Sequence, residues 1–164
     1  MPDPLCITAI GGENPLFQPL LRPTLAFLII TVLGGCSEIE NEVIKIGAIP
    51  AFVGVADDQE SRLRGLSFRK KLGVNEGLLF IFPKEKILHI WMLNVEIPLD
   101  VAFFDQDRKL INIHSMEPDD GEKSYPSVKP ALYALEMSQG WFSRNHLTSG
   151  ATLHLSRPPS AQAR

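Results

Sequence analysis

Residues 77–82 read Gly-Leu-Leu-Phe-Ile-Phe (GLLFIF), a continuous apolar run that is closed by Pro83. The run is short for a helix but has the usual length of a strand. Because no polar residue alternates with the apolar ones, the pattern predicts a strand that is buried on both faces. Such a strand must be covered by another sheet or by helices, so the pattern predicts a layered domain.

The segments before this run predict two further strands and a short helix. Residues 43–46 and 51–56 are apolar stretches separated by Gly47 and Pro50, and we expect them to pair or to lie side by side. Asp57, with Glu60 three residues later, resembles a capping box. It predicts a helix over residues 58–64, before Gly65.

The segments after the run are also mostly strands. Asp105 to Arg108 form an expected turn that joins two strands as a hairpin, and residues 117–130 form an expected surface loop. A second short helix is expected over residues 139–147. The predicted strands of this part are residues 87–95, 99–105, 109–116, 131–137 and 151–156. About eight short strands with one or two short helices predict a mainly β chain, folded as a single β-sandwich or barrel-like domain.

Composition limits the function classes that the chain can belong to. The 164 residues include 45% apolar ones and carry a net charge of −3, which fits one globular domain. No basic stripe interleaved with aromatic residues occurs, and this argues against nucleic acid as a partner. The cysteines are Cys6 and Cys36. A domain that follows Cys36 therefore has no thiol for a disulfide, a thiolate zinc site or a cysteine nucleophile.

The N-terminal segment predicts export. Residues 25–33 (LAFLIITVL) follow Arg22 and precede Gly34, Gly35 and Cys36. As a helix this run covers about 14 Å, roughly half of a bilayer core, so it favours a secretory signal over a membrane span. A buried core segment is the alternative. We expect residues 1–35 to be the signal segment, and residues 1–20, with four prolines, to precede the true translation start.

The stretch Leu33-Gly34-Gly35-Cys36 resembles the lipobox of bacterial lipoproteins. The resemblance implies that Cys36 is diacylated and becomes the new N-terminus, so that the membrane is a partner of the chain. Residues 36–42 would then be anchor and tether, residues 43–156 the β domain, and residues 157–164 a disordered tail. Ser37 stands where lipoproteins retained in the inner membrane usually have Asp. This favours the periplasmic face of the outer membrane, if two membranes exist.

Four blocks of the sequence together resemble the domain-of-unknown-function 192 family. They are Arg64 to Arg69 (RGLSFR), Gly77 to Phe82, Trp91 to Asn94 (WMLN) and Ile97 to Asp100 (IPLD). The resemblance implies a compact, mostly β domain of prokaryotes that is often exported and lipid-anchored. It implies no established reaction. The chain departs from the family pattern where Met, Lys and Thr are usual, at Ser67, Leu93 and Val95.

Several polar residues are embedded in or beside these apolar blocks and are the candidates for a binding site. We expect them to line one pocket: Arg64, Arg69, Trp91, Asn94, Asp100 and Glu136. In a functional interpretation the arginines bind an anionic group, the indole stacks on a ring and the amide fixes its orientation. In a structural interpretation the two acids pair with the arginines and brace a loop.

Known catalytic signatures are missing from the sequence. The histidines are His89, His114, His146 and His154, and no pair has the spacing of a metal site. Neither a nucleophile elbow nor a phosphate-binding loop occurs. We therefore expect no cofactor or metal, and a binding or accessory domain for a small anionic or sugar-like ligand or an envelope partner rather than an enzyme. The alternatives are a hydrolase that uses Asp100 and Glu136, and a purely structural or assembly protein.

Overall fold

The apolar run lies in the middle of a seven-stranded sheet. A computed structural model describes residues 41–156 and places the strands of this sheet in the order β6-β5-β8-β3-β2-β1-β9. The strands are β1 (Asn41–Ile46), β2 (Ile49–Ala56), β3 (Glu76–Lys86), β5 (Leu99–Phe104), β6 (Leu110–Met116), β8 (Ala131–Ser138) and β9 (Leu153–His154). β4 (His89–Ile90) and β7 (Tyr125–Pro126) pair as a small second sheet, and the helices are α1 (Gln59–Arg64) and α2 (Trp141–Arg144).

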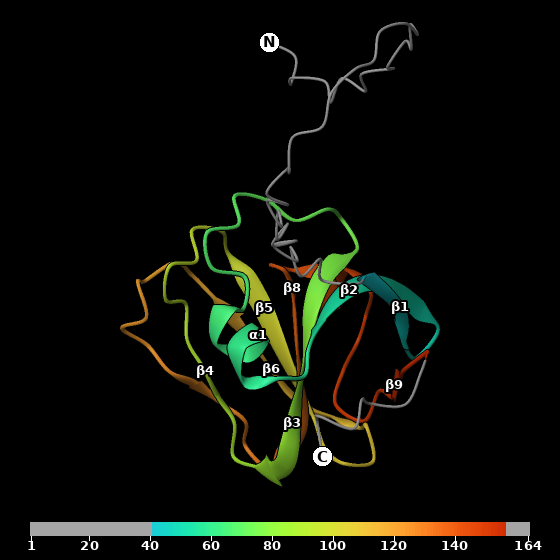
Figure 1. Cartoon of the computed structure of the whole chain (residues 1–164). Helices are drawn as coiled ribbons and strands as arrows, with labels where there is room; N and C mark the ends of the chain where they lie inside the picture. The colour runs from blue at the N-terminus through green and yellow to red at the C-terminus, as the bar shows by residue number, and fades with distance from the viewer. Residues whose placement is uncertain (1–40, 157–164) are drawn as a thin grey trace, which may run out of the picture. The chain divides into compact units, whose positions relative to one another are not determined.

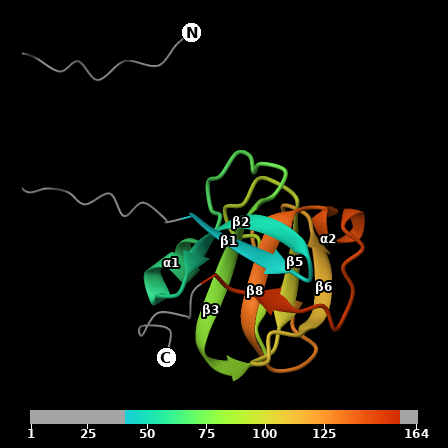
Figure 2. The ribbon, with the colours of Figure 1, turned by 90° about the vertical axis from the view of Figure 1, so that its right-hand side faces the viewer.

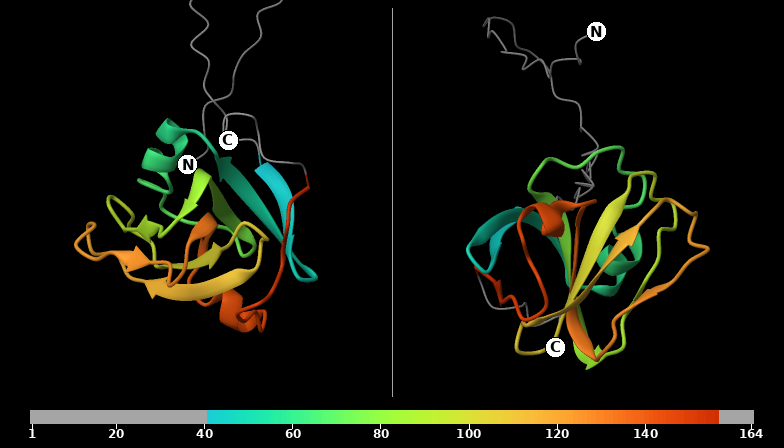
Figure 3. Two further views of the ribbon diagram at one scale, coloured as in Figure 1. Left: turned by 90° about the horizontal axis from the view of Figure 1, so that it is seen from below. Right: turned by 180° about the vertical axis from the view of Figure 1, so that it is seen from behind.

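The large sheet is mixed and curled. β2 and β3 are parallel, because α1 and the loop after it connect them, and the other neighbours in the sheet are antiparallel. The sheet curls into a half-barrel (Figures 1 and 3). The fold is therefore mainly β, as predicted.

Two hydrophobic clusters occupy opposite faces of the central strands. Leu79, Ile81 and the α2 residue Trp141 belong to the cluster inside the curl, whereas Leu78 and Phe80 belong to the cluster beneath the α1 side. Alternate residues of β3 thus enter different cores, as a strand buried on both faces requires. Figure 2 shows α1 and α2 on opposite sides of the sheet.

The predicted pairings are confirmed, but several predicted boundaries are wrong. β1 pairs with β2, and β5 pairs with β6 across the expected turn. The predicted strand over residues 87–95 is a strand only at His89–Ile90, and the rest is loop. Met92, which is fully buried, and Val95 anchor this loop in the core. Because buried loop residues are apolar like buried strand residues, the sequence pattern resembles that of a strand. The second helix and the last strand are also shorter than predicted.

The helix cap lies one residue later than predicted. Asp58, not Asp57, is the N-cap of α1, and its carboxylate accepts a hydrogen bond from the backbone N–H of Ser61 at 3.0 Å. The Ser61 hydroxyl in turn accepts from the Asp58 backbone, so Ser61 takes the place that the sequence pattern gave to Glu60. The predicted signal segment, lipid anchor and C-terminal tail lie outside the described residues, apart from the end of the tether at residues 41 and 42.

Gly77 permits the close approach of β3 and β8. A Cβ at this position would lie 2.2 Å from the carbonyl oxygen of Glu136 and 2.4 Å from the sulfur of Met137. Gly77→Ala should therefore destabilise the domain by about 3 kcal/mol, because both the backbone of β8 and the sulfur must move. The measurement is urea unfolding followed by circular dichroism.

Gly47→Ala is the matched control for this substitution. A Cβ at Gly47 would meet nothing within 4 Å, and the cost there is only that of a left-handed backbone at φ +58°, about 1 kcal/mol. A loss in Gly77→Ala no larger than the loss in Gly47→Ala would contradict the steric role of Gly77.

Candidate functional site

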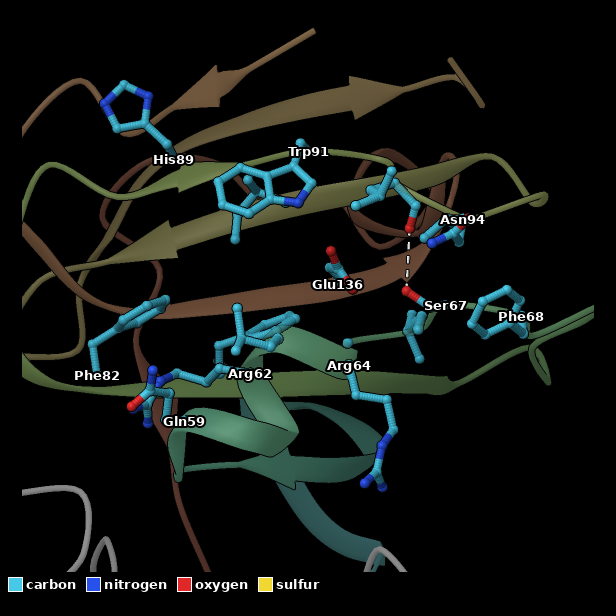
Figure 4. A pocket seen from close by; sticks show the side chains of 17 residues that line it. Gln59, Arg62, Arg64, Ser67, Phe68, Phe82, His89, Trp91, Asn94 and Glu136 are labelled. Carbon is cyan, nitrogen blue, oxygen red and sulfur yellow. Dashed lines mark hydrogen bonds between the residues drawn. The ribbon is translucent and has the colours of Figure 1, made fainter. Parts of the chain in front are cut away.

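A cavity of about 360 Å³ lies on the face of the sheet that carries α1. One wall is α1 with the residues that follow it up to Phe68, and the opposite wall is the segment from His89 to Val95. Phe80 and Phe82 of β3 and Glu136 of β8 contribute the remaining lining. Figure 4 shows Glu136 between Trp91 on one side and Arg62 on the other.

The two walls are joined at one end by hydrogen bonds. The Ser67 hydroxyl donates to the carbonyl oxygen of Leu93 at 3.1 Å, and the backbone N–H of Phe68 donates to that of Asn94 at 2.8 Å. Phe68 and Asn94 both have a left-handed backbone, with φ of 63° and 57°. Asn tolerates this conformation whereas Phe does not favour it, so the joined walls hold Phe68 in a strained position.

Gly65 lets the chain turn sharply from α1 into this wall. Its φ of 51° and ψ of −137° belong to a region that only glycine adopts readily. The ring of Phe80 would lie 3.6 Å from a Cβ at this position. This is an ordinary contact distance, so glycine is needed here for its backbone conformation rather than for space.

Glu136 is the most unusual residue of the cavity. Its side chain is 4% exposed, and no hydrogen bond or ion pair within residues 41–156 reaches its buried Oε2 atom. Burial raises the pKa of the Glu136 carboxyl to about 8, because no nearby partner compensates for the lost hydration of the charged form. At neutral pH the carboxyl is therefore mostly protonated.

Arg62 positions the helix and is a lining residue that sequence reasoning missed. Its Nη1 atom donates to the carbonyl oxygens of Asp57 and of Ile81, the latter at 2.9 Å. Its guanidinium also lies over the ring of Phe82, 5.5 Å from the centroid. These contacts tie α1 to β3, and no spacing pattern in the sequence marks them.

Four of the six predicted site residues line the cavity. They are Arg64, Trp91, Asn94 and Glu136. The guanidinium of Arg64 nevertheless points away from Glu136 and Trp91 in Figure 4, and it pairs with Glu60 at 2.7 Å on the surface. The prediction that all six residues line one pocket is wrong for Arg69, which is exposed and does not line the cavity.

Asp100 is also outside the cavity, on the opposite face of the sheet. Its two oxygens accept hydrogen bonds from the Ser115 hydroxyl at 2.7 Å and from the backbone N–H of Gly140 at 2.8 Å. Val101, not Asp100, is opposite Glu136 in the register of β5 and β8. Since neighbouring residues of a strand face opposite ways, the two acids do not share a cleft. Asp100 instead holds the turn that leads into α2.

Phe68 and His89 also line the cavity but were not among the predicted site residues, whereas Trp91 was. Phe68 is 69% exposed and Trp91 51% exposed, so both offer apolar surface at the rim. His89 lines the cavity from β4, and its Nδ1 atom lies 3.0 Å from the Ser124 hydroxyl. The described residues contain no group of three or more His, Cys, Asp or Glu arranged to hold a metal ion.

Fold and site together define a small β domain whose cavity is lined by one acid, Glu136, and by several aromatic rings. The sequence profile of the domain-of-unknown-function 192 family, described as "Uncharacterized ACR", matches residues 43–155. The chain belongs to this family.

Solved structures with the same fold include two bacterial proteins. One is a candidate transcription regulator from Sinorhizobium meliloti 1021, 27% identical, with a TM-score of 0.67 over 72% of this chain and 95% of that one. The other is a protein of unknown function from Novosphingobium aromaticivorans DSM 12444, 26% identical, with a TM-score of 0.67 over 73% of this chain and 89% of that one. No curated protein matches the chain.

The raised pKa of Glu136 makes stability depend on pH. Between the ordinary pKa of 4.5 and about 8, the unfolded chain releases a proton that the folded domain keeps, so the free energy of unfolding falls as pH rises. We expect this residue to contribute a loss of about 1.4 kcal/mol per pH unit in that window. Glu136→Gln should lack this slope, and urea unfolding at several pH values measures it.

Asp100→Asn, which changes the other buried acid of this region, is the control. It should lower stability at every pH, because one of the hydrogen bonds that Asp100 accepts is weakened, and it should keep the slope that Glu136 contributes. Parallel pH curves for the native chain and Glu136→Gln would show that Glu136 is ionised at neutral pH.

Proposed function

We propose that the domain binds a small ligand in the cavity above Glu136 and serves as a binding or accessory protein of the cell envelope rather than as an enzyme. One observation supports this most strongly. A buried carboxyl that has an unpaired oxygen lines a cavity to which Phe68, Phe80, Phe82 and Trp91 contribute aromatic rings. A cavity of about 360 Å³ lies within the usual range of small-molecule sites.

A ligand gains free energy from two features of this cavity. Leaving a buried polar atom unpaired costs about 1–3 kcal/mol, and a ligand that offers a hydrogen bond to Glu136 recovers part of it. A ligand that covers the exposed faces of Trp91 and Phe68 gains further binding free energy from the apolar surface that it buries. The ligand that fits therefore has an apolar or ring-shaped body and one polar group.

An anionic ligand has less support than a neutral one. Arg64 is directed outward and paired with Glu60, and Arg69 does not line the cavity, so neither offers a free cation inside it. A sugar-like or aromatic ligand fits the role proposed for Trp91, because its ring could stack on the indole. The net charge of −3 argues against nucleic acid as the ligand of this chain. The naming of the Sinorhizobium protein as a transcription regulator therefore does not change the proposal.

The hydrolase alternative has lost its catalytic pair. Two carboxyls that act on one bond must face the same cleft. Asp100 and Glu136 face opposite sides of the sheet, and Asp100 is occupied by Ser115 and Gly140. The structural alternative accounts for Asp100 but not for Glu136, which braces nothing within the described part of the chain.

We further propose that the chain is lipid-anchored through Cys36. The support is the sequence itself, in which a short apolar run ends at Leu33-Gly34-Gly35-Cys36. Two acyl chains hold a protein stably at a membrane, whereas one does so only marginally. Anchored in this way, the domain would act outside the cytoplasm, at the periplasmic face of the outer membrane if two membranes exist. Residues 41–156 contain no helix able to cross a bilayer.

Ligand binding can be tested with phenethyl alcohol, a neutral compound with a ring and one hydroxyl. In an NMR titration we expect shifts concentrated at residues 64–68 and 91–95. Trp91→Ala should weaken binding about tenfold, because it removes the half-exposed ring of one wall. Phe52→Ala is the matched control, since Phe52 is 49% exposed but does not line the cavity. Equal weakening in both variants, or no binding by the native chain, would contradict the proposal.

Lipidation can be tested on the full chain in a bacterial host that lipidates exported proteins. Intact mass spectrometry should find a chain that begins at Cys36 and carries acyl groups. Cys36→Ser should lose the acyl mass, whereas Cys6→Ser, which changes the other cysteine, should leave it unchanged. Unmodified peptides that run through Cys36 in the native protein would rule out the anchor.

A further inference from the structure

The unsatisfied carboxyl of Glu136 indicates which polar group the ligand carries. We propose that the cavity binds a small amine, whose ammonium group pairs with Glu136 while its apolar stem lies against the aromatic wall. This inference rests on the proposed ligand-binding function and narrows it to one class of compound.

The charged side chains around Glu136 leave it without a cation of the protein's own. From α1, Arg62 is held by two backbone carbonyls and by the ring of Phe82, and Arg64 is held by Glu60. From β4, His89 lies beside Ser124. The residues that flank Glu136 in the sheet are the apolar Leu78 and Val101. No charged side chain of the described residues therefore pairs with the Glu136 carboxyl, and we assign that role to the ligand.

An ammonium group satisfies this carboxyl better than a neutral group does. It has three donors and no acceptor, and its positive charge pairs with the ionised carboxylate, whereas a hydroxyl is neutral and has a single donor. Phe80, Phe82 and Trp91 line the same cavity, but the ring of Phe82 already contacts Arg62 and Lys86. The ring faces of Phe80 and Trp91 attract cations as well as apolar stems. The ionised acid and the rings together would thus attract an ammonium group with an apolar stem.

Binding of a cation at this position must release a proton. With a pKa of about 8, the Glu136 carboxyl is mostly protonated at neutral pH and must ionise to pair with the ammonium. An alkylamine, with a pKa near that of lysine, keeps its own charge over the same range. We therefore expect amine affinity to rise about twentyfold between about pH 6.5 and about pH 8.5.

The experiment compares phenethylamine with phenethyl alcohol, which has the same stem. Isothermal titration calorimetry on the full chain in nonionic detergent, in two buffers with different ionisation enthalpies, measures affinity and proton release together. We expect the amine to bind at least about tenfold more tightly than the alcohol at about pH 8.5. We also expect it to release close to one proton at about pH 6.5.

Glu136→Gln separates this inference from the proposed function. The variant should still bind the alcohol, and the advantage of the amine and its pH dependence should disappear. If the native chain binds both compounds equally and without proton release, the amine inference is overturned while the ligand cavity stands. If it binds neither, both proposals fall. The proton release of the native chain needs no variant, so a folding defect in Glu136→Gln does not obscure the result.

Discussion

The pairing of β3 with β8 is the interaction on which the rest of the domain depends. Most of β8 and residues 78–81 of β3 are buried, and alternate residues of the two strands enter two separate hydrophobic clusters. Each cluster needs its own cover, which α2 and the curl of the sheet provide on one face and the α1 side with the small sheet provides on the other. The absence of a side chain at Gly77 allows the two strands to approach. Glu136 is fixed by the same pairing, opposite Leu78.

The sequence predicted the elements of the fold better than their boundaries. The run at residues 77–82, the hairpin partners and the short helix before Gly65 could be recognised because their patterns depend on local chemistry and burial. The segment after Ile90 could not, because Met92 and Val95 are buried from a loop and resemble strand residues in the sequence. Loop residues that reach a core carry no period that distinguishes them from a strand.

The candidate site was predicted in part, and the two buried acids show why. Asp100 and Glu136 both interrupt apolar strands, so the sequence suggests the same interpretation for each. Only the register of β5 and β8 shows that they face opposite sides of the sheet, and only the contacts show that one is paired and the other is not. Arg62 was missed for a related reason, because its partners are backbone carbonyls that no side-chain pattern reveals.

The presence of Glu136 is difficult to explain by stability alone. Its neighbours on the same face, Ala134 and Val101, are apolar, and an apolar residue of similar size would remove the cost of burying a carboxyl. The carboxylate of Asp100 accepts two hydrogen bonds that hold a turn and offset the cost of its burial, whereas the buried Oε2 atom of Glu136 accepts none within residues 41–156. A polar group that weakens the fold and lines a cavity is what a binding site would require, and this is why we place the proposed ligand beside it. Under the proposed function, the carboxyl of Glu136 marks the face of the domain that binds the ligand.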